Sequence, residues 1–141
     1  MQTRYFWLFK CLLYIPINTS PMAEHNDIGK AGEILAQKHM AENGYTILEK
    51  NWKHGKDEID IIATDGKFLV IAEVKTRQSN RLGEPELSVN RDKQRFLVRA
   101  ADAYIQRHTI SMETRFDVVS VLLKGDKATI NHIADAFYPT L

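Results

Sequence analysis

Residues 58–76 constrain the fold more than any other part of the chain. This stretch, EIDIIATDGKFLVIAEVKT, places runs of aliphatic and β-branched residues on either side of the dipeptide Asp65-Gly66. An Asp-Gly pair between two such runs is a strong signal for a tight β-hairpin. We therefore predict strands at residues 58–64 and 67–76, paired antiparallel through this turn.

Helical and strand patterns surround the hairpin. Apolar spacing predicts a helix over residues 27–43, in which Gly29 and Gly32 indicate close approach by another backbone or simply an early turn. Further strands are expected at residues 45–52, 114–123 and 128–137. A second helix is expected over residues 89–108, with an apolar stripe of Phe96, Leu97, Ala100, Ala101, Tyr104 and Ile105. This order predicts an α/β fold, with helices flanking a mixed sheet.

Length and composition bound the class of protein. A chain of 141 residues that is 44% hydrophobic and 26% charged is typical of one ordinary globular domain. The net charge of +1 argues neither for nor against nucleic acid, so a polyanion would need a local basic patch. Cys11 is the single cysteine, which rules out an internal disulfide and fits a reducing, cytoplasmic location.

The first 21 residues form an unusual apolar segment. Residues 5–17, YFWLFKCLLYIPI, are too few to span a bilayer, and no good signal-peptide cleavage site follows them. We therefore expect no membrane insertion. Met22 opens a stretch that looks like a natural beginning. We expect residues 1–21 to be a weakly ordered extension and residues 22–141 to form a single domain.

Three charged residues interrupt the apolar strands of the hairpin. Asp60 lies on the first strand, and Glu73 and Lys75 share one face of the second, because side chains alternate across a strand. Antiparallel pairing through the turn brings Asp60 and Glu73 close together, to within a residue of register. Two adjacent carboxylates repel each other, and a divalent cation turns that repulsion into attraction.

The chemistry of this group favours Mg²⁺ (or Mn²⁺), which prefers oxygen ligands and often uses one or two protein carboxylates. The arrangement suits phosphodiester hydrolysis, with the ion polarising the phosphate and Lys75 neutralising charge in the transition state. On spacing alone, a cross-strand ion pair on a solvated face explains the same residues. The apolar run of residues 68–72 directly before Glu73 favours the metal site.

A local excess of positive charge surrounds the second helix. Two readings are open: phosphate contacts along a nucleic-acid strand, or an ordinary solvated helix face. The residues concerned are Arg77, Arg81, Arg91, Lys93, Arg95 and Arg99.

Residues 29–137 resemble the YraN family of small bacterial proteins, distant relatives of archaeal Holliday-junction resolvases within the PD-(D/E)XK nuclease superfamily. The stretches that carry the resemblance are GKAGEILAQKHM, GYTILEKNWK, EIDIIATDGKFLVIAEVKTR, DKQRFLVRAADAYI, RFDVVSV and IADAF, in the family's order. They cover about three quarters of the chain. The resemblance implies a restriction-endonuclease-like αβββαβ core, which agrees with the predicted element order.

The resemblance also implies roles for particular residues. Asp60 and Glu73 would be the metal ligands, with the carbonyl of Val74 as a third, and Lys75 would be catalytic. Glu33 matches the helix glutamate that completes the site, and Gln94 would border it. Asp57 departs from the glycine usual before EID, which could alter the turn or add charge near the metal.

Two functions remain open at this point. The first is a Mg²⁺-dependent endonuclease that acts on DNA, with branched or structured DNA as the candidate substrate. The second is a nucleic-acid-binding or partner-binding protein on a nuclease fold whose catalysis is weak or lost. A homodimer would match the two-fold symmetry of a junction, and a monomer is the simpler alternative.

Overall fold

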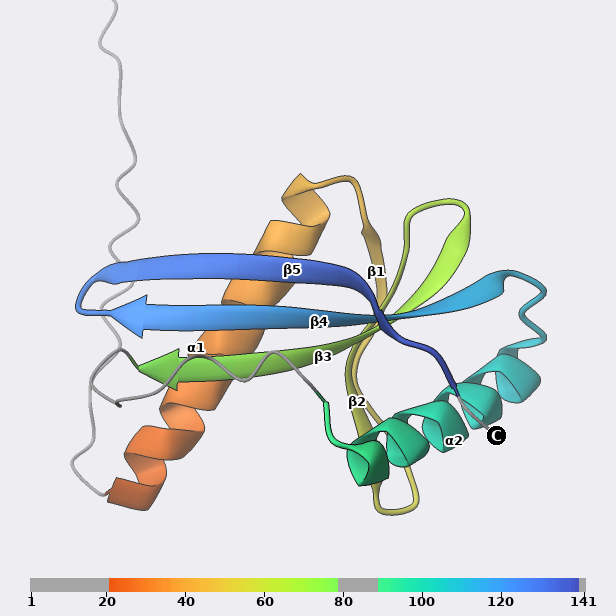
Figure 1. Ribbon diagram of the computed structural model, residues 1–141, viewed down its shortest axis with the longest axis horizontal. Helices are drawn as coiled ribbons and strands as arrows, with labels where there is room; N and C mark the ends of the chain where they lie inside the picture. Colours follow the sequence, from red (N-terminus) through yellow and green to blue (C-terminus); the bar gives the residue numbers. More distant parts are fainter. Residues whose placement is uncertain (1–20, 79–88, 140–141) are drawn as a thin grey trace, which may run out of the picture.

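A single mixed sheet of five strands organises the protein (Figure 1). The computed structural model describes residues 21–78 and 89–139. The elements follow as α1 (Pro21–Glu42), β1 (Thr46–His54), β2 (Asp57–Thr64), β3 (Phe68–Gln78), α2 (Arg91–His108), β4 (Glu113–Lys124) and β5 (Lys127–Phe137). The strands lie in sequence order; β3 and β4 are parallel and the other neighbours are antiparallel. The predicted α/β class is confirmed, and the arrangement is consistent with a restriction-endonuclease-like core.

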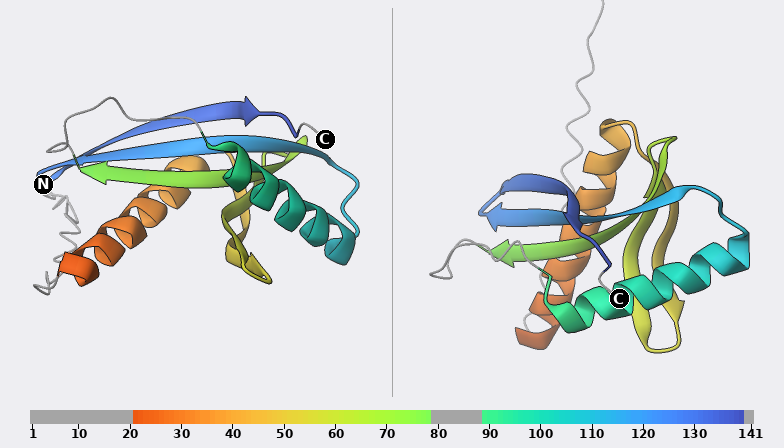
Figure 2. Two further views of the ribbon diagram at one scale, coloured as in Figure 1. Left: turned by 60° about the horizontal axis from the view of Figure 1, so that its bottom comes forward. Right: turned by 45° about the vertical axis from the view of Figure 1, so that its right-hand side comes forward.

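The two helices pack against opposite faces of the sheet because β3 alternates its side chains. Val70 and Ala72 face α1, where Ala36 and Met40 complete one buried cluster. Leu69 and Ile71 face α2, where a second buried cluster includes Leu97, Ala100, Ala101 and Tyr104. Figure 2 shows that the β1–β2 hairpin runs at a steep angle to β4 and β5, so the sheet is strongly twisted. Neither described helix is long and apolar enough to cross a membrane.

The turn between β2 and β3 is tied to β4 by an arginine. Asp65 accepts hydrogen bonds from the backbone N–H groups of Lys67 and Phe68, which closes the turn. Arg115 donates to the same carboxylate at 3.0 Å and makes two further bonds of 2.9 Å to the buried carboxylate of Asp117. The register of the hairpin is thereby anchored to the rest of the sheet, which fixes the residues that lie opposite each other further along it.

Two features differ from the sequence predictions. Helix α1 begins at Pro21 rather than at residue 27, because proline is favoured at a first helical position and the residues after it include good helix formers. Phe96 is 43% exposed rather than part of the core stripe. The centre of its ring lies 5.2 Å from the guanidinium carbon of Arg99. The position of Phe96 around the helix axis directs its side chain away from the sheet. Residues 1–20 and Arg81 lie outside the described residues.

Gly32 marks the close contact between α1 and β3. A Cβ atom at this position would overlap the side chain of Thr76, including Thr76 Cβ at 2.7 Å. Gly29, one turn earlier, has open space at the same point. Of the two glycines, Gly32 is therefore the one at which the predicted close contact occurs, and its neighbour there is a side chain of β3. The missing Cβ atom allows this part of α1 to pack against the sheet.

We predict opposite effects for alanine at these two glycines. Gly32→Ala should destabilise the protein by about 1–3 kcal/mol, because the branched side chain of Thr76 cannot swing away from the added carbon. Gly29→Ala is the matched control and should stabilise it by up to about 1 kcal/mol through helix propensity. Urea unfolding of both variants measures the difference. Equal free energies of unfolding would contradict the close packing of α1 on β3.

Candidate functional site

The candidate site lies where β2 and β3 separate. Their pairing ends at Ile61 opposite Ala72, and the next positions along the same register are Asp60 and Glu73. At this fork the backbone N–H of Val74 donates to Asp60 Oδ2 at 2.7 Å. The carboxylate of Asp60 thus accepts the hydrogen bond that a backbone carbonyl of a paired strand would otherwise accept. This bond holds Asp60 against β3. The structure brings Asp60 and Glu73 together, as the hairpin spacing predicted.

Asp60 carries a strongly perturbed carboxyl group. Burial raises the pKa of Asp60 to about 7, and the negative charge of Glu73 pushes it in the same direction. The hydrogen bond from Val74 and the charge of Lys93 oppose this rise in pKa only in part. A raised pKa means that the ionised form of Asp60 is disfavoured, because burial and the charge of Glu73 outweigh the hydrogen bond from Val74 and the positive charge of Lys93.

Glu73 presents a buried oxygen. Its Oε2 accepts no hydrogen bond from the described residues, although the ammonium of Lys93 lies 3.0 Å away in an ion pair. The contact is therefore close but not aligned as a hydrogen bond. The Glu73 side chain is 13% exposed. A buried carboxylate oxygen in this state retains its capacity to bind a ligand, because burial has removed the water that would otherwise satisfy it.

Glu33 approaches the site from α1 and is held by Asn51. The amide Nδ2 of Asn51 donates to Glu33 Oε2 at 3.0 Å. Asn51 lies between the paired residues Lys50 and Trp52 of β1, on the register position facing Asp60, and has a left-handed backbone with φ of 47°. Asparagine adopts that conformation more readily than most residues. Sequence reasoning missed Asn51; an asparagine inside a β-prone segment was the available signal.

The charge of Glu33 contributes a little to the raised pKa of Asp60. However, no three His, Cys, Asp or Glu side chains between residues 21–78 and 89–139 form a group able to hold a metal ion. The structure thus offers two carboxylates rather than a ring of ligands. An ion held there would complete its coordination with backbone oxygen, water or substrate.

Lys75 follows Glu73 by two positions in β3, so both side chains leave the same face of the strand. Lys75 is partly buried, and Arg77, two positions further, is exposed. Val74 lies between Glu73 and Lys75 and uses its N–H on Asp60. Glu73, Val74 and Lys75 therefore lie on β3 beyond its last pair with β2, and Asp60 is held to them from β2 by the Val74 N–H.

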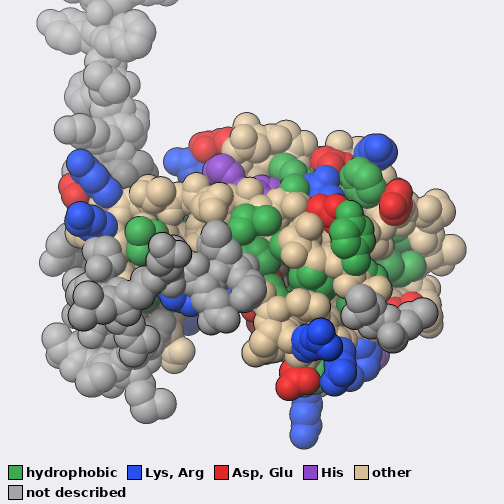
Figure 3. All heavy atoms as spheres, viewed as in Figure 1, with side chains coloured by type: hydrophobic (Ala, Val, Ile, Leu, Met, Phe, Trp, Pro, Cys, Tyr) green, Lys and Arg blue, Asp and Glu red, His purple; other side chains and the backbone are tan. Residues whose placement is uncertain are grey.

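Most cationic residues predicted on α2 are paired within the protein. Arg99 binds Asp57 through two hydrogen bonds of 2.7 and 2.9 Å, and Arg95 lies 3.5 Å from Asp92. Figure 3 shows blue and red side chains mixed in this region. A groove of about 550 Å³ follows the helix and is lined by Arg91, Gln94, Arg95, Val98, Arg99, Asp102 and Pro139.

Two further sequence predictions concern Gln94, which lies on this helix, and Asp57, which lies on β2. Gln94 donates its amide to the carbonyl of Val89 at 2.7 Å and so supports the entry to α2. Asp57, which departs from the family's usual glycine, forms the ion pair with Arg99. The guanidinium of Arg99 holds the pKa of that carboxyl below its usual range. The extra carboxylate therefore joins β2 to α2 and has its charge compensated there.

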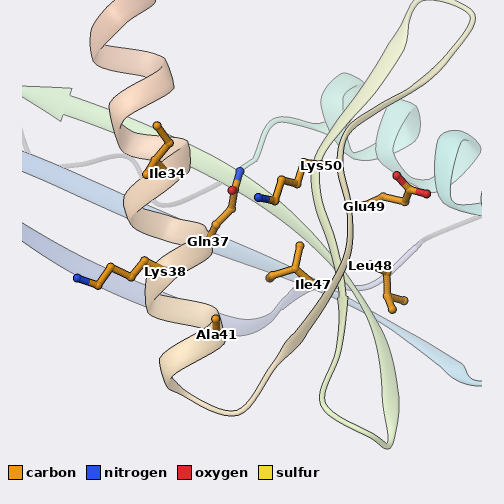
Figure 4. A pocket seen from close by; sticks show the side chains of 8 residues that line it. All are labelled: Ile34, Gln37, Lys38, Ala41, Ile47, Leu48, Glu49 and Lys50. Atoms are coloured by element: carbon orange, nitrogen blue, oxygen red, sulfur yellow. The ribbon is translucent and has the colours of Figure 1, made fainter. Parts of the chain in front are cut away.

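A larger hollow of about 710 Å³ lies between α1 and β1. It is lined by Ile34, Gln37, Lys38 and Ala41 of α1 and by Ile47, Leu48, Glu49 and Lys50 of β1. Figure 4 shows that Ile47 and Lys50 extend toward α1, whereas Leu48 and Glu49 leave β1 on its other side. This lining contains aliphatic side chains and long charged ones, but only one carboxylate. It lacks the paired acidic groups of the fork, so the fork is the better candidate for a metal-binding and catalytic site.

Comparison with known proteins finds close sequence relatives. A sequence model of the uncharacterised protein family UPF0102 matches residues 32–121. A UPF0102 protein of Bacteroides thetaiotaomicron is 45% identical over 120 residues, which cover 85% of this chain and 99% of the relative. A UPF0102 protein of Phocaeicola vulgatus is 40% identical over the same coverage. One from Flavobacterium johnsoniae is 42% identical, covering 83% of this chain and 98% of its own.

The raised pKa of Asp60 predicts a pH-dependent effect of Asp60→Asn in metal-free buffer. The folded protein holds this proton up to about pH 7, whereas the unfolded chain releases it near 3.8. The contribution of Asp60 to the free energy of unfolding is therefore largest below the pKa that this group has in the unfolded chain, and it is lost as the pH rises to about 7. Relative to wild type, Asp60→Asn should gain stability between pH 4 and pH 7 and then level off.

Urea unfolding of both proteins in EDTA at several pH values measures this difference. The expected gain is on the order of a few kcal/mol at pH 8. Other carboxyls, such as Asp57 and Asp65, have a lowered pKa and also make stability depend on pH. Their contributions cancel in the comparison, because both proteins contain them. A difference that does not change between pH 4 and pH 8 would contradict the raised pKa of Asp60, and with it the burial of this carboxyl and its closeness to Glu73.

Proposed function

The chain belongs to the uncharacterised protein family UPF0102, and we propose, from the site that it carries, that it is a Mg²⁺- or Mn²⁺-dependent endonuclease. It hydrolyses phosphodiester bonds in DNA, with branched or structured DNA as the preferred substrate. The observation that carries the proposal is the pair of carboxylates at the β2–β3 fork, where Glu73 Oε2 is buried and accepts no hydrogen bond from the described residues.

The residues at the fork fit a hard divalent cation. Mg²⁺ accepts one or two protein carboxylates and completes its shell with water and substrate phosphate. Asp60 and Glu73 supply those carboxylates, and the carbonyl of Val74 is the candidate third ligand. The pKa of Asp60, raised to about 7 by burial and by Glu73, supports this assignment, because a divalent cation would favour its ionised form.

The bound ion would supply charge stabilisation at the phosphate and a more acidic water. The chain supplies the remaining functions. Lys75, on the same face of β3 as Glu73, places a positive charge beside the phosphate as negative charge develops. Glu33, held by Asn51 at 3.0 Å, orients water at the rim of the site. Arg77 and the exposed Arg91 contact neighbouring phosphates along the strand.

The second candidate function is a nucleic-acid-binding or partner-binding protein with weak or lost catalysis. One observation favours it: the ammonium of Lys93 already lies 3.0 Å from Glu73, so the acidic pair has a cation from the chain itself. The ion pairs along α2 also reduce the free positive charge there. Under this alternative the fork is a structural ion pair.

A cytoplasmic location and a homodimer complete the proposal. The single cysteine fits a reducing compartment. A two-fold symmetric pair of sites would match the symmetry of a four-way junction. A monomer acting on single-stranded flaps or nicks is the simpler arrangement, and the choice of substrate separates the two.

Cleavage assays test the proposal directly. Four-way junctions, flaps, nicked duplex, linear duplex and single-stranded DNA, with RNA counterparts, are incubated with Mg²⁺, Mn²⁺ or EDTA. We expect cleavage of branched DNA that requires metal. Glu73→Gln should lower the rate at least about 10–100-fold, the loss typical even of changes outside the ligand set. Glu42→Gln makes the same change at an exposed α1 position and should keep the wild-type rate.

Two results would contradict the enzyme proposal. If Glu73→Gln cleaves as fast as wild type, the activity does not come from the fork. If wild type binds DNA but cleaves no substrate with either metal, the binding-protein alternative is correct.

A further inference from the structure

Lys93 reaches the acidic pair from the first turn of α2. Its backbone N–H is fixed by the capping side chain of Asn90, at 2.8 Å, whereas its ammonium lies 3.0 Å from Glu73 Oε2. The side chain is 33% exposed. The lysine is therefore anchored at its backbone, while its flexible stem and the partial exposure of its side chain allow the ammonium to change position.

We propose that Lys93 is a displaceable cation that occupies the place of the divalent ion when no metal is bound. The ammonium compensates the carboxylates in the metal-free protein. When a divalent ion binds, the ammonium leaves Glu73 and contacts a substrate phosphate instead. This inference rests on the proposed metal site and adds to it a reason why metal and nucleic acid should bind together.

Competition follows from the shared oxygen. Glu73 Oε2 is buried, and the ammonium of Lys93 lies 3.0 Å from it. A divalent ion on that oxygen would lie within a few ångströms of the ammonium, and the two positive charges would repel each other. Because the ammonium already lies 3.0 Å from this buried oxygen, the two cations compete for it.

The ion pair has the character of a temporary contact. Lys93 and Glu73 are close, but no group in the described part of the chain donates an aligned hydrogen bond to Glu73 Oε2. The same helix offers a contrast in Arg99, which holds Asp57 through two aligned hydrogen bonds. A planar guanidinium suits a fixed bidentate pair, whereas an ammonium on a flexible stem suits a contact that must break. Helix α2 thus carries one permanent bridge and one releasable bridge to the hairpin strands.

Displacement couples the two ligands of the site. A bound metal releases Lys93 for a phosphate, and a bound phosphate draws Lys93 away from Glu73. Each ligand therefore raises the affinity for the other, by the same factor in both directions. Without nucleic acid the lysine weakens metal binding, so the metal ion binds mainly when the nucleic-acid substrate is also bound.

Mn²⁺ affinity tests this role without any measurement of cleavage. Wild type, Lys93→Gln, Lys38→Gln and Glu73→Gln are titrated with Mn²⁺ by calorimetry in the absence of nucleic acid. Lys93→Gln should bind Mn²⁺ at least about fivefold more tightly than wild type, the lower end of ordinary coupling between sites. Lys38→Gln removes the same charge from an exposed position on α1 and should match wild type.

The outcomes separate the two proposals. If wild type binds Mn²⁺ through Glu73 but Lys93→Gln binds it no more tightly, the displacement role is wrong and the metal site stands. If wild type and Lys93→Gln bind no Mn²⁺, or bind it as well as Glu73→Gln does, both proposals fail.

A measurement on the unaltered protein covers the case in which Lys93→Gln does not fold. The ¹³Cε resonance of Lys93 should shift on addition of Mg²⁺, while that of Lys38 stays in place. A Lys93 resonance that does not respond to saturating Mg²⁺ would overturn the displacement role.

Discussion

The hydrogen bond from the Val74 N–H to Asp60 shapes the centre of this protein. It stands at the point where β2 and β3 stop pairing. A continued strand ladder would satisfy the backbone donor of Val74 with a carbonyl; here a carboxylate does so and allows the strands to part. Burying a carboxylate is unfavourable unless it is hydrogen-bonded or paired. The hydrogen bond that separates the two strands therefore also holds the carboxyl group of Asp60 in a mostly buried position.

Several distant contacts hold the fork in position. Arg115 ties the β2–β3 turn to β4 through Asp65 and Asp117, which sets the register that brings Asp60 opposite Glu73. On one face, Gly32 allows α1 to approach Thr76 and brings Glu33 near the site. From the other side, the Asp57–Arg99 bridge links the start of β2 to α2, and Lys93 extends from the same helix. The acidic pair is thus surrounded by both helices and by the strands that carry it.

Local sequence patterns were enough to predict the hairpin and to place its acidic residues near each other, to within a residue of register. The register itself could not be read from Asp65-Gly66, because the structure pairs Thr64 with Leu69 and so makes the connection longer than a two-residue turn. The partner of Lys93 could not be predicted in this way, because it depends on how α2 packs against β3. The same holds for Asn51, whose left-handed conformation depends on the path of β1 around the fork. Phe96 fits an apolar stripe by spacing, but the sheet covers a narrower part of the helix.

The position of a bound cation shows whether the β2–β3 fork is a metal centre. Anomalous diffraction from crystals of the protein grown with Mn²⁺ locates the ion without reliance on activity. We expect one ion within about 2–2.5 Å of an oxygen of Asp60 and an oxygen of Glu73, with the ammonium of Lys93 withdrawn from Glu73. An ion bound elsewhere, or none bound and Lys93 still in contact with Glu73, would contradict the assignment of the fork as a metal centre.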